Sequence, residues 1–271
     1  MELRLLGTVE VWAGETRLRV GARRERLVLG VLALEVNRPV PTERLVALMW
    51  PDGAPVTARQ GVAVGVCRLR RVLTGEGGRP RVETVGRGYR LAADPASVDA
   101  HRFRELVAMA RTRRDDRGRV RVYREALALW RGPALADAAD PATARRLTQG
   151  LAEARLTAVE ECLDAELRLG RHAVVLDELT DLVARHPFRQ RLTARLMLAQ
   201  YRAGRPSDAL ATYREAWERL RDGVGIEPEP RLRLLHAAIL RADPALEAPH
   251  RPVAPPPRRR HRTVLLRRPP R

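Results

Sequence analysis

The chain has 271 residues, two cysteines and a formal net charge of +18 at pH 7. The widely separated Cys67 and Cys162 exclude a disulfide framework and a cysteine-rich metal site. The length predicts about two domains, each able to bury its own core, and the positive charge favours a polyanionic partner such as nucleic acid.

All 51 basic side chains are arginine. Arginine supplies phosphate contacts, although abundant Arg, Ala, Gly and Pro without Lys is also typical of a GC-rich genome. The sequence lacks the pattern of a secretory signal, and it has no run of about 18 apolar residues that would span a bilayer. We therefore expect a cytoplasmic, nucleoid-associated protein with no membrane partner.

The chain begins with alternating segments that predict a small antiparallel sheet over residues 2–6, 8–12 and 17–20. A helix is expected over 23–36, and the prolines at 39 and 41 end it. Thr42 is expected to cap a second helix over 43–50, because a threonine side chain accepts hydrogen bonds from the first free amides of a helix.

A third helix is expected over residues 56–73, with one apolar side and one basic side. Its apolar stripe consists of Val62, Val66, Leu69 and Leu73. The side chains that point away from this stripe include Gln60, Cys67, Arg68 and Arg71. This pattern is typical of a DNA-reading helix, and an ordinary amphipathic helix with solvated arginines is the alternative.

A short hairpin is expected after the third helix, with strands over 81–84 and 89–92. Gly86 and Gly88 supply the backbone freedom that a tight turn needs, and Arg87 lies between them. The order of three strands, three helices and two strands predicts a winged helix-turn-helix with an N-terminal sheet.

The second part of the chain contains a repeat. Gly170-Arg171 and Gly204-Arg205 recur at a spacing of 34 residues, each followed by a helical pattern. Helices are expected over 99–114, 117–130, 144–169, 172–185, 188–203, 206–222 and 229–241, stacked as a solenoid. The predicted fold is mainly α with a small antiparallel β component, in which the winged helix-turn-helix precedes an all-α tetratricopeptide-like domain.

We predict three segments: a winged helix over 1–97, a helical domain over 98–243 and a tail over 244–271. The tail is rich in proline and arginine and is expected to be disordered. It acts either as a solvated terminus or as a nonspecific anchor on DNA.

Several phrases resemble the Streptomyces antibiotic regulatory protein (SARP) family. In the first part they are LVALMW at 45–50, RLRRVL at 68–73 and GYRL at 88–91, which look like an OmpR-type domain. In the second part they are LALWRGPAL at 127–135, GIEPEP at 225–230 and LLHAAIL at 234–240, which resemble the bacterial transcriptional activator domain. The resemblance covers roughly residues 1–243.

This resemblance implies an activator of secondary-metabolite gene clusters that binds direct repeats in double-stranded promoter DNA. The expected DNA-binding residues are Arg59, Gln60, Ala63, Cys67, Arg68, Arg70, Arg71 and Arg87. Gln60 suits adenine, Ala63 a thymine methyl group, and Arg70 and Arg71 guanine or phosphate. Arg59 and Arg68 suit flanking phosphates, and Arg87 suits the minor groove.

The central residues Ala63, Gly65 and Cys67 stand where family members often carry polar or aromatic groups, which suggests reliance on backbone charge or DNA shape. The resemblance also implies that RNA polymerase holoenzyme contacts the loop Pro51, Asp52, Gly53 and Ala54, and it allows a homodimer, including one that forms on DNA. Phosphate-loop, zinc-protease and serine-hydrolase motifs are absent, so we expect no enzyme, cofactor or metal. The alternatives are a helical-repeat scaffold and a sequence-blind nucleic-acid binder.

Overall fold

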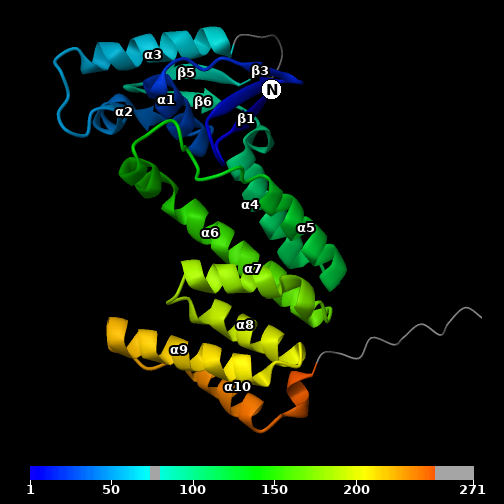
Figure 1. Ribbon diagram of the computed structural model, residues 1–271. Coiled ribbons are helices and arrows are strands. Elements are labelled where there is room, and N and C mark those ends of the chain that lie inside the picture. The colour runs from blue at the N-terminus through cyan, green and yellow to red at the C-terminus, as the bar shows by residue number, and fades with distance from the viewer. Residues whose placement is uncertain (74–79, 248–271) are drawn as a thin grey trace, which may run out of the picture.

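The computed structural model describes residues 1–73 and 80–247. The first part contains β1 (Glu2–Arg4), β2 (Glu10–Ala13), β3 (Thr16–Leu18), α1 (Arg23–Leu34), β4 (Val40–Pro41), α2 (Thr42–Met49), α3 (Ala58–Val72), β5 (Arg81–Val85) and β6 (Gly88–Ala92). The predicted fold class is confirmed, because a winged helix precedes an all-helical region (Figure 1).

Two small antiparallel sheets frame the first three helices. One has the order β1-β2-β3 and the other the order β4-β6-β5. The sequence did not predict β4, a two-residue strand in which Val40 pairs with Tyr89 and Pro41 with Gly88. Its proline is tolerated because β4 lies at the edge of its sheet.

Gly88 is required where the wing meets β4. A Cβ atom on this residue would lie 2.3 Å from the carbonyl oxygen of Val40, so no side chain fits without moving the backbone. At the turn, Gly86 has φ of +55°, a conformation that glycine adopts readily. The two glycines therefore fix both the path of the wing and its distance from β4.

The second part is helical. Its α-helices are α4 (Asp99–Thr112), α5 (Asp116–Ala128), α6 (Pro141–Arg168), α7 (His172–Arg185), α8 (Gln190–Arg202), α9 (Pro206–Val224) and α10 (Pro230–Leu240). Single turns of 3-10 helix, Pro95–Ser97 and Pro244–Leu246, flank them. In Figure 1, α7 to α10 form a stack below α4 to α6, as the predicted solenoid requires.

The 34-residue repeat corresponds to repeated helix ends. Gly170 follows α6 with φ of +72°, and Gly204 follows α8 with φ of +75°. A glycine at this position ends a helix without the strain that a side chain would cause there. Each glycine thus allows the chain to turn into the next antiparallel helix.

The winged helix and the helical region share one core. A single cluster of buried apolar side chains includes Leu5 and Leu6 from the first part and Phe103 and Leu135 from the second. Leu135 packs directly on α1, because a Cβ atom at Gly30 would lie 2.7 Å from its Cδ2 atom. The expectation that each part buries its own core is therefore wrong for this junction.

Polar contacts reinforce the junction. The buried carboxylate of Asp99 accepts hydrogen bonds from the amides of Leu5 at 2.7 Å and Leu6 at 3.1 Å. The guanidinium of Arg131 lies 3.4 Å from the same carboxylate. The backbone amide of Arg131 donates to the carbonyl of Leu6 at 2.7 Å. Asp99 and Arg131 thus hold the two residues that follow β1 against the beginning of α4.

Most of the predicted tail, residues 248–271, lies outside the described residues. Within residues 1–73 and 80–247, no helix is both long and apolar enough to cross a membrane. The same residues contain no group of three or more side chains that would hold a metal ion.

Candidate nucleic-acid interface

The helix α3 has one buried and one exposed side. Its buried apolar side chains are Ala58, Val62, Val66 and Leu69, and Leu73 follows them at the end of the helix. Its exposed residues are Arg59, Gln60, Ala63, Val64, Cys67, Arg68, Arg70 and Arg71. The predicted apolar stripe is confirmed, and seven of the eight proposed DNA contacts lie on the exposed side.

Two arginines attach the edges of this exposed side to neighbouring elements. The Nη1 atom of Arg68 donates to Oε1 of Glu25 in α1 at 2.6 Å. On the other edge, Arg70 donates to the carbonyl of Val82 and to Oγ1 of Thr84, both at 2.8 Å. Arg70 therefore fixes the wing relative to α3, a role that its position in the sequence did not indicate.

The carboxylate of Glu25 is almost completely buried beneath Arg68. Burial raises the pKa of this carboxylate. The hydrogen bonds from Arg68 and from the amides of Glu25 and Ala22 together lower the pKa by more, so it lies below the ordinary 4.5. The amide of Ala22 donates to Oε2 at 3.0 Å and completes the first turn of α1. Glu25 thus joins the beginning of α1 to α3 in its charged form.

Replacing Glu25 with glutamine is expected to lower the free energy of unfolding near neutral pH by about 1 kcal/mol. A carboxyl group with a lowered folded-state pKa contributes stability above its unfolded pKa and loses it as the pH falls through the folded value. The difference in the free energy of unfolding between wild type and Glu25→Gln should therefore narrow as the pH falls below the ordinary pKa of a glutamate, as measured by urea unfolding.

Glu15→Gln is the matched control, because Glu15 is exposed and has no hydrogen bond or ion pair within the described residues. The control should unfold like the wild type at every pH. If the difference in the free energy of unfolding between Glu25→Gln and the wild type stays constant with pH, the Glu25 carboxylate does not stabilise the fold through its charge.

The remaining exposed residues form the centre of the face. Arg59 is 76% exposed and forms an ion pair with Glu43 of α2 at 3.1 Å. An ion pair this exposed is weak and is easily exchanged for a phosphate. Cys67 is a free thiol at the surface. Sequence reasoning missed Val64, which is 45% exposed and which its helical position alone would have placed beside Gln60 and Cys67.

Arg87 is exposed in the two-residue turn between β5 and β6. Its carbonyl accepts hydrogen bonds from the amide of Thr42 at 3.0 Å and from Oγ1 of Thr42 at 2.9 Å. The prediction that Thr42 caps α2 is wrong, because Thr42 is the first residue of the helix and Pro41 is its N-cap. The pairing of β4 with β6 brings the wing within reach of the Thr42 hydroxyl.

The connection between α2 and α3 is open to solvent. Its residues Pro51, Asp52, Gly53 and Ala54 are all exposed. Trp50, immediately before them, is half-buried against the core and lies under the guanidinium of Arg24, 4.7 Å from the ring centroid. Trp50 also packs on Gly61, where a Cβ atom would lie 2.9 Å from the indole ring.

The fold and this surface define a class of protein. The family model of the bacterial transcriptional activator domain matches residues 98–240, and that of the C-terminal domain of transcriptional regulatory proteins matches residues 18–91. The chain is thus a transcriptional regulator in which an OmpR-type winged helix precedes an activator domain.

Similar proteins narrow this class to one family. Regulatory protein DnrI of Streptomyces peucetius is 34% identical, over 91% of this chain and 94% of its own length. Transcriptional regulator RedD of Streptomyces coelicolor is also 34% identical, over 92% of this chain and 73% of its own length. The chain belongs to the Streptomyces antibiotic regulatory protein family.

A solved structure supports the same assignment. Mycobacterium tuberculosis EmbR, in complex with a low-affinity phosphopeptide, matches with a TM-score of 0.82 and 32% sequence identity. The match covers 90% of this chain but only 65% of the EmbR chain.

Proposed function

We propose that this regulator is a sequence-specific DNA-binding transcriptional activator of a secondary-metabolite gene cluster. The observation that carries the proposal is the exposed side of α3, which presents Gln60, Ala63, Cys67 and Arg71 next to a wing fixed by Arg70. A helix that projects side chains from one free face fits the major groove. The similarity to the Streptomyces regulators DnrI and RedD, together with membership of the antibiotic regulatory protein family, favours a secondary-metabolite gene cluster as the target.

In the proposed complex, α3 lies in the major groove and Arg87 enters the adjacent minor groove, where guanidinium groups favour narrow, negative DNA. Arg59 contacts a flanking phosphate after exchanging its bond with Glu43. Arg68 and Arg70 contact phosphates only with guanidinium hydrogens left over from their bonds within the protein. The site offers few base-reading groups, so much of its affinity comes from backbone charge and DNA shape.

RNA polymerase is the second proposed partner, with the exposed loop Pro51–Ala54 as its contact. Two copies of the protein occupy adjacent direct repeats, so that each presents this loop in the same direction along the promoter. The helical domain, which shares its core with the winged helix, supports the proposed contact between the two copies.

Binding to the chain's own upstream region, compared with a scrambled duplex of equal length over a range of salt concentrations, tests the proposal. We expect the native duplex to bind at least about a thousandfold more tightly than the scrambled one, which is the lower end of the range typical of specific binders. Equal affinity for the two duplexes would indicate a sequence-blind binder. No binding to either would indicate a protein-interaction scaffold. A footprint on the same DNA measures the repeat spacing.

A further inference from the structure

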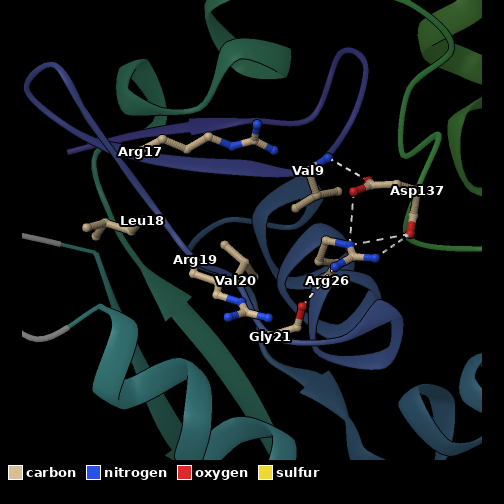
Figure 2. A pocket seen from close by; sticks show the side chains of 8 residues that line it. All are labelled: Val9, Arg17, Leu18, Arg19, Val20, Gly21, Arg26 and Asp137. Carbon is tan, nitrogen blue, oxygen red and sulfur yellow. Dashed lines mark hydrogen bonds and ion pairs between the residues drawn. The ribbon is translucent and has the colours of Figure 1, made fainter.

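A pocket of about 340 Å³ opens where the winged helix meets the helical domain. Figure 2 shows it between β3, the beginning of α1 and the loop that precedes α6. Its lining residues are Val9, Arg17, Leu18, Arg19, Val20, Gly21, Arg26 and Asp137. Three arginines and a single acid therefore share the pocket with an apolar wall.

The three arginines differ in how far they are already bonded. Arg26 is bound to Asp137, with Nε 2.9 Å from Oδ2, and donates to the carbonyl of Gly21 at 2.8 Å. Arg17 forms an ion pair with Glu10, in which its Nη2 atom lies 3.3 Å from Oε1. The exposed Arg19 makes no hydrogen bond or ion pair within the described residues, and in Figure 2 it extends toward Gly21 and Arg26.

We propose that this pocket binds a small phosphate monoester with a compact apolar body. The lining holds three arginines and the single acid Asp137, and Arg17 is also paired with Glu10 outside the lining, so Arg19 carries the positive charge in excess. A phosphate monoester is close to a dianion at neutral pH. Its three terminal oxygens accept hydrogen bonds from several guanidinium groups at once, in the bidentate geometry that arginine favours.

The size and wall of the pocket restrict the rest of the ligand. Binding pockets span about 300–1,000 Å³, so 340 Å³ suits a small metabolite. Val9, Leu18 and Val20 form an apolar wall beside the arginines, which favours a ligand whose body is at least partly apolar. A long polyanion such as DNA does not exploit this wall.

An occupied pocket would act on the junction between the two parts. Asp137 belongs to the helical domain and also accepts a hydrogen bond from the amide of Val9 at 2.8 Å, next to β2. A bound phosphate competes with Asp137 for the guanidinium of Arg26. The ligand therefore loosens one of the contacts that hold the winged helix to the helical domain.

Calorimetric titration of the full chain with phenyl phosphate tests this site, with phenol and inorganic phosphate as the two partial ligands. We expect one molecule to bind per chain, at least tenfold more tightly than either partial ligand. Arg19→Gln should weaken binding at least tenfold, because among the arginines of the lining only Arg19 lacks a partner within the described residues. Asp137→Asn should tighten binding severalfold, because it removes the competing carboxylate.

Arg121→Gln is the matched control, since Arg121 is an exposed arginine of α5 with no partner within the described residues. It should leave phenyl phosphate affinity unchanged, as should Arg71→Gln on the DNA-facing side of α3. The proposal is overturned by the absence of saturable binding or by equal losses in Arg19→Gln and Arg121→Gln. Loss of binding in Arg71→Gln would also overturn it. Circular dichroism verifies that each variant is folded.

Discussion

Replacing Asp99 with alanine is expected to lower the free energy of unfolding by about 3 kcal/mol. The change removes the acceptor for the buried amides of Leu5 and Leu6 and leaves Arg131 without its acidic partner. A buried backbone donor that loses its acceptor costs about 1–3 kcal/mol, and this site has two of them. Urea unfolding followed by circular dichroism measures the difference.

Asp94→Ala provides the control for this prediction. The Asp94 carboxylate also accepts a backbone hydrogen bond, from Ala96 at 2.9 Å, but it is exposed to solvent. Water replaces the lost acceptor there, so we expect a change of at most about 1 kcal/mol. Equal unfolding midpoints for Asp99→Ala and the wild type would contradict the proposed role of this carboxylate at the junction.

Replacing Arg71 with alanine is expected to weaken binding to the chain's own upstream region, the proposed target, by about tenfold or more at fixed salt. Arg71 is exposed in the last turn of α3, on the side that faces away from the core. The salt dependence distinguishes its role in the complex. If Arg71 contacts a phosphate, its loss reduces the magnitude of the slope of log K against log salt by about one and weakens binding to all sequences equally. A guanine contact acts only on the repeats.

Arg121→Ala in α5 is the control for the Arg71 variant, since it removes the same charge from a distant, exposed position. It should bind the repeats nearly as well as the wild type. An unchanged dissociation constant for Arg71→Ala would remove this residue from the DNA interface. Equal losses in the two variants would mean that net charge alone governs binding.

Most helices were predictable because their apolar residues recur with the period of a helix and their ends are marked by proline or glycine. The prediction for 206–222, for example, corresponds to α9 (Pro206–Val224). This helix begins at a proline, and Gly225, with φ of +70°, follows its last residue. The strand β4 was not predictable. It has two residues, one of them proline, and it exists only because β6 lies beside it.

For the candidate interface, the exposed residues of α3 were predictable, whereas the hydrogen-bond partners of its arginines were not. The period of α3 correctly separated Val62 and Val66 from Gln60 and Cys67. The partners of Arg68 and Arg70 were not predictable, since Glu25 is 43 residues from Arg68 and the acceptors of Arg70 are in β5. Nothing in the local sequence distinguishes an arginine that holds the fold from one that is available to DNA.

Four features follow from the sequence alone: the order of the elements, the two-sided character of α3, the 34-residue repeat and the family resemblance. These are local properties, set by residue spacing and by the backbone preferences of glycine and proline. The folded chain adds three features that the sequence did not reveal: the two parts share a core, Asp99 of α4 binds the residues that follow β1, and Arg17, Arg19 and Arg26 line one pocket. These contacts join residues far apart in the chain, and their charges and hydrogen-bond donors come within bonding distance only when the chain folds.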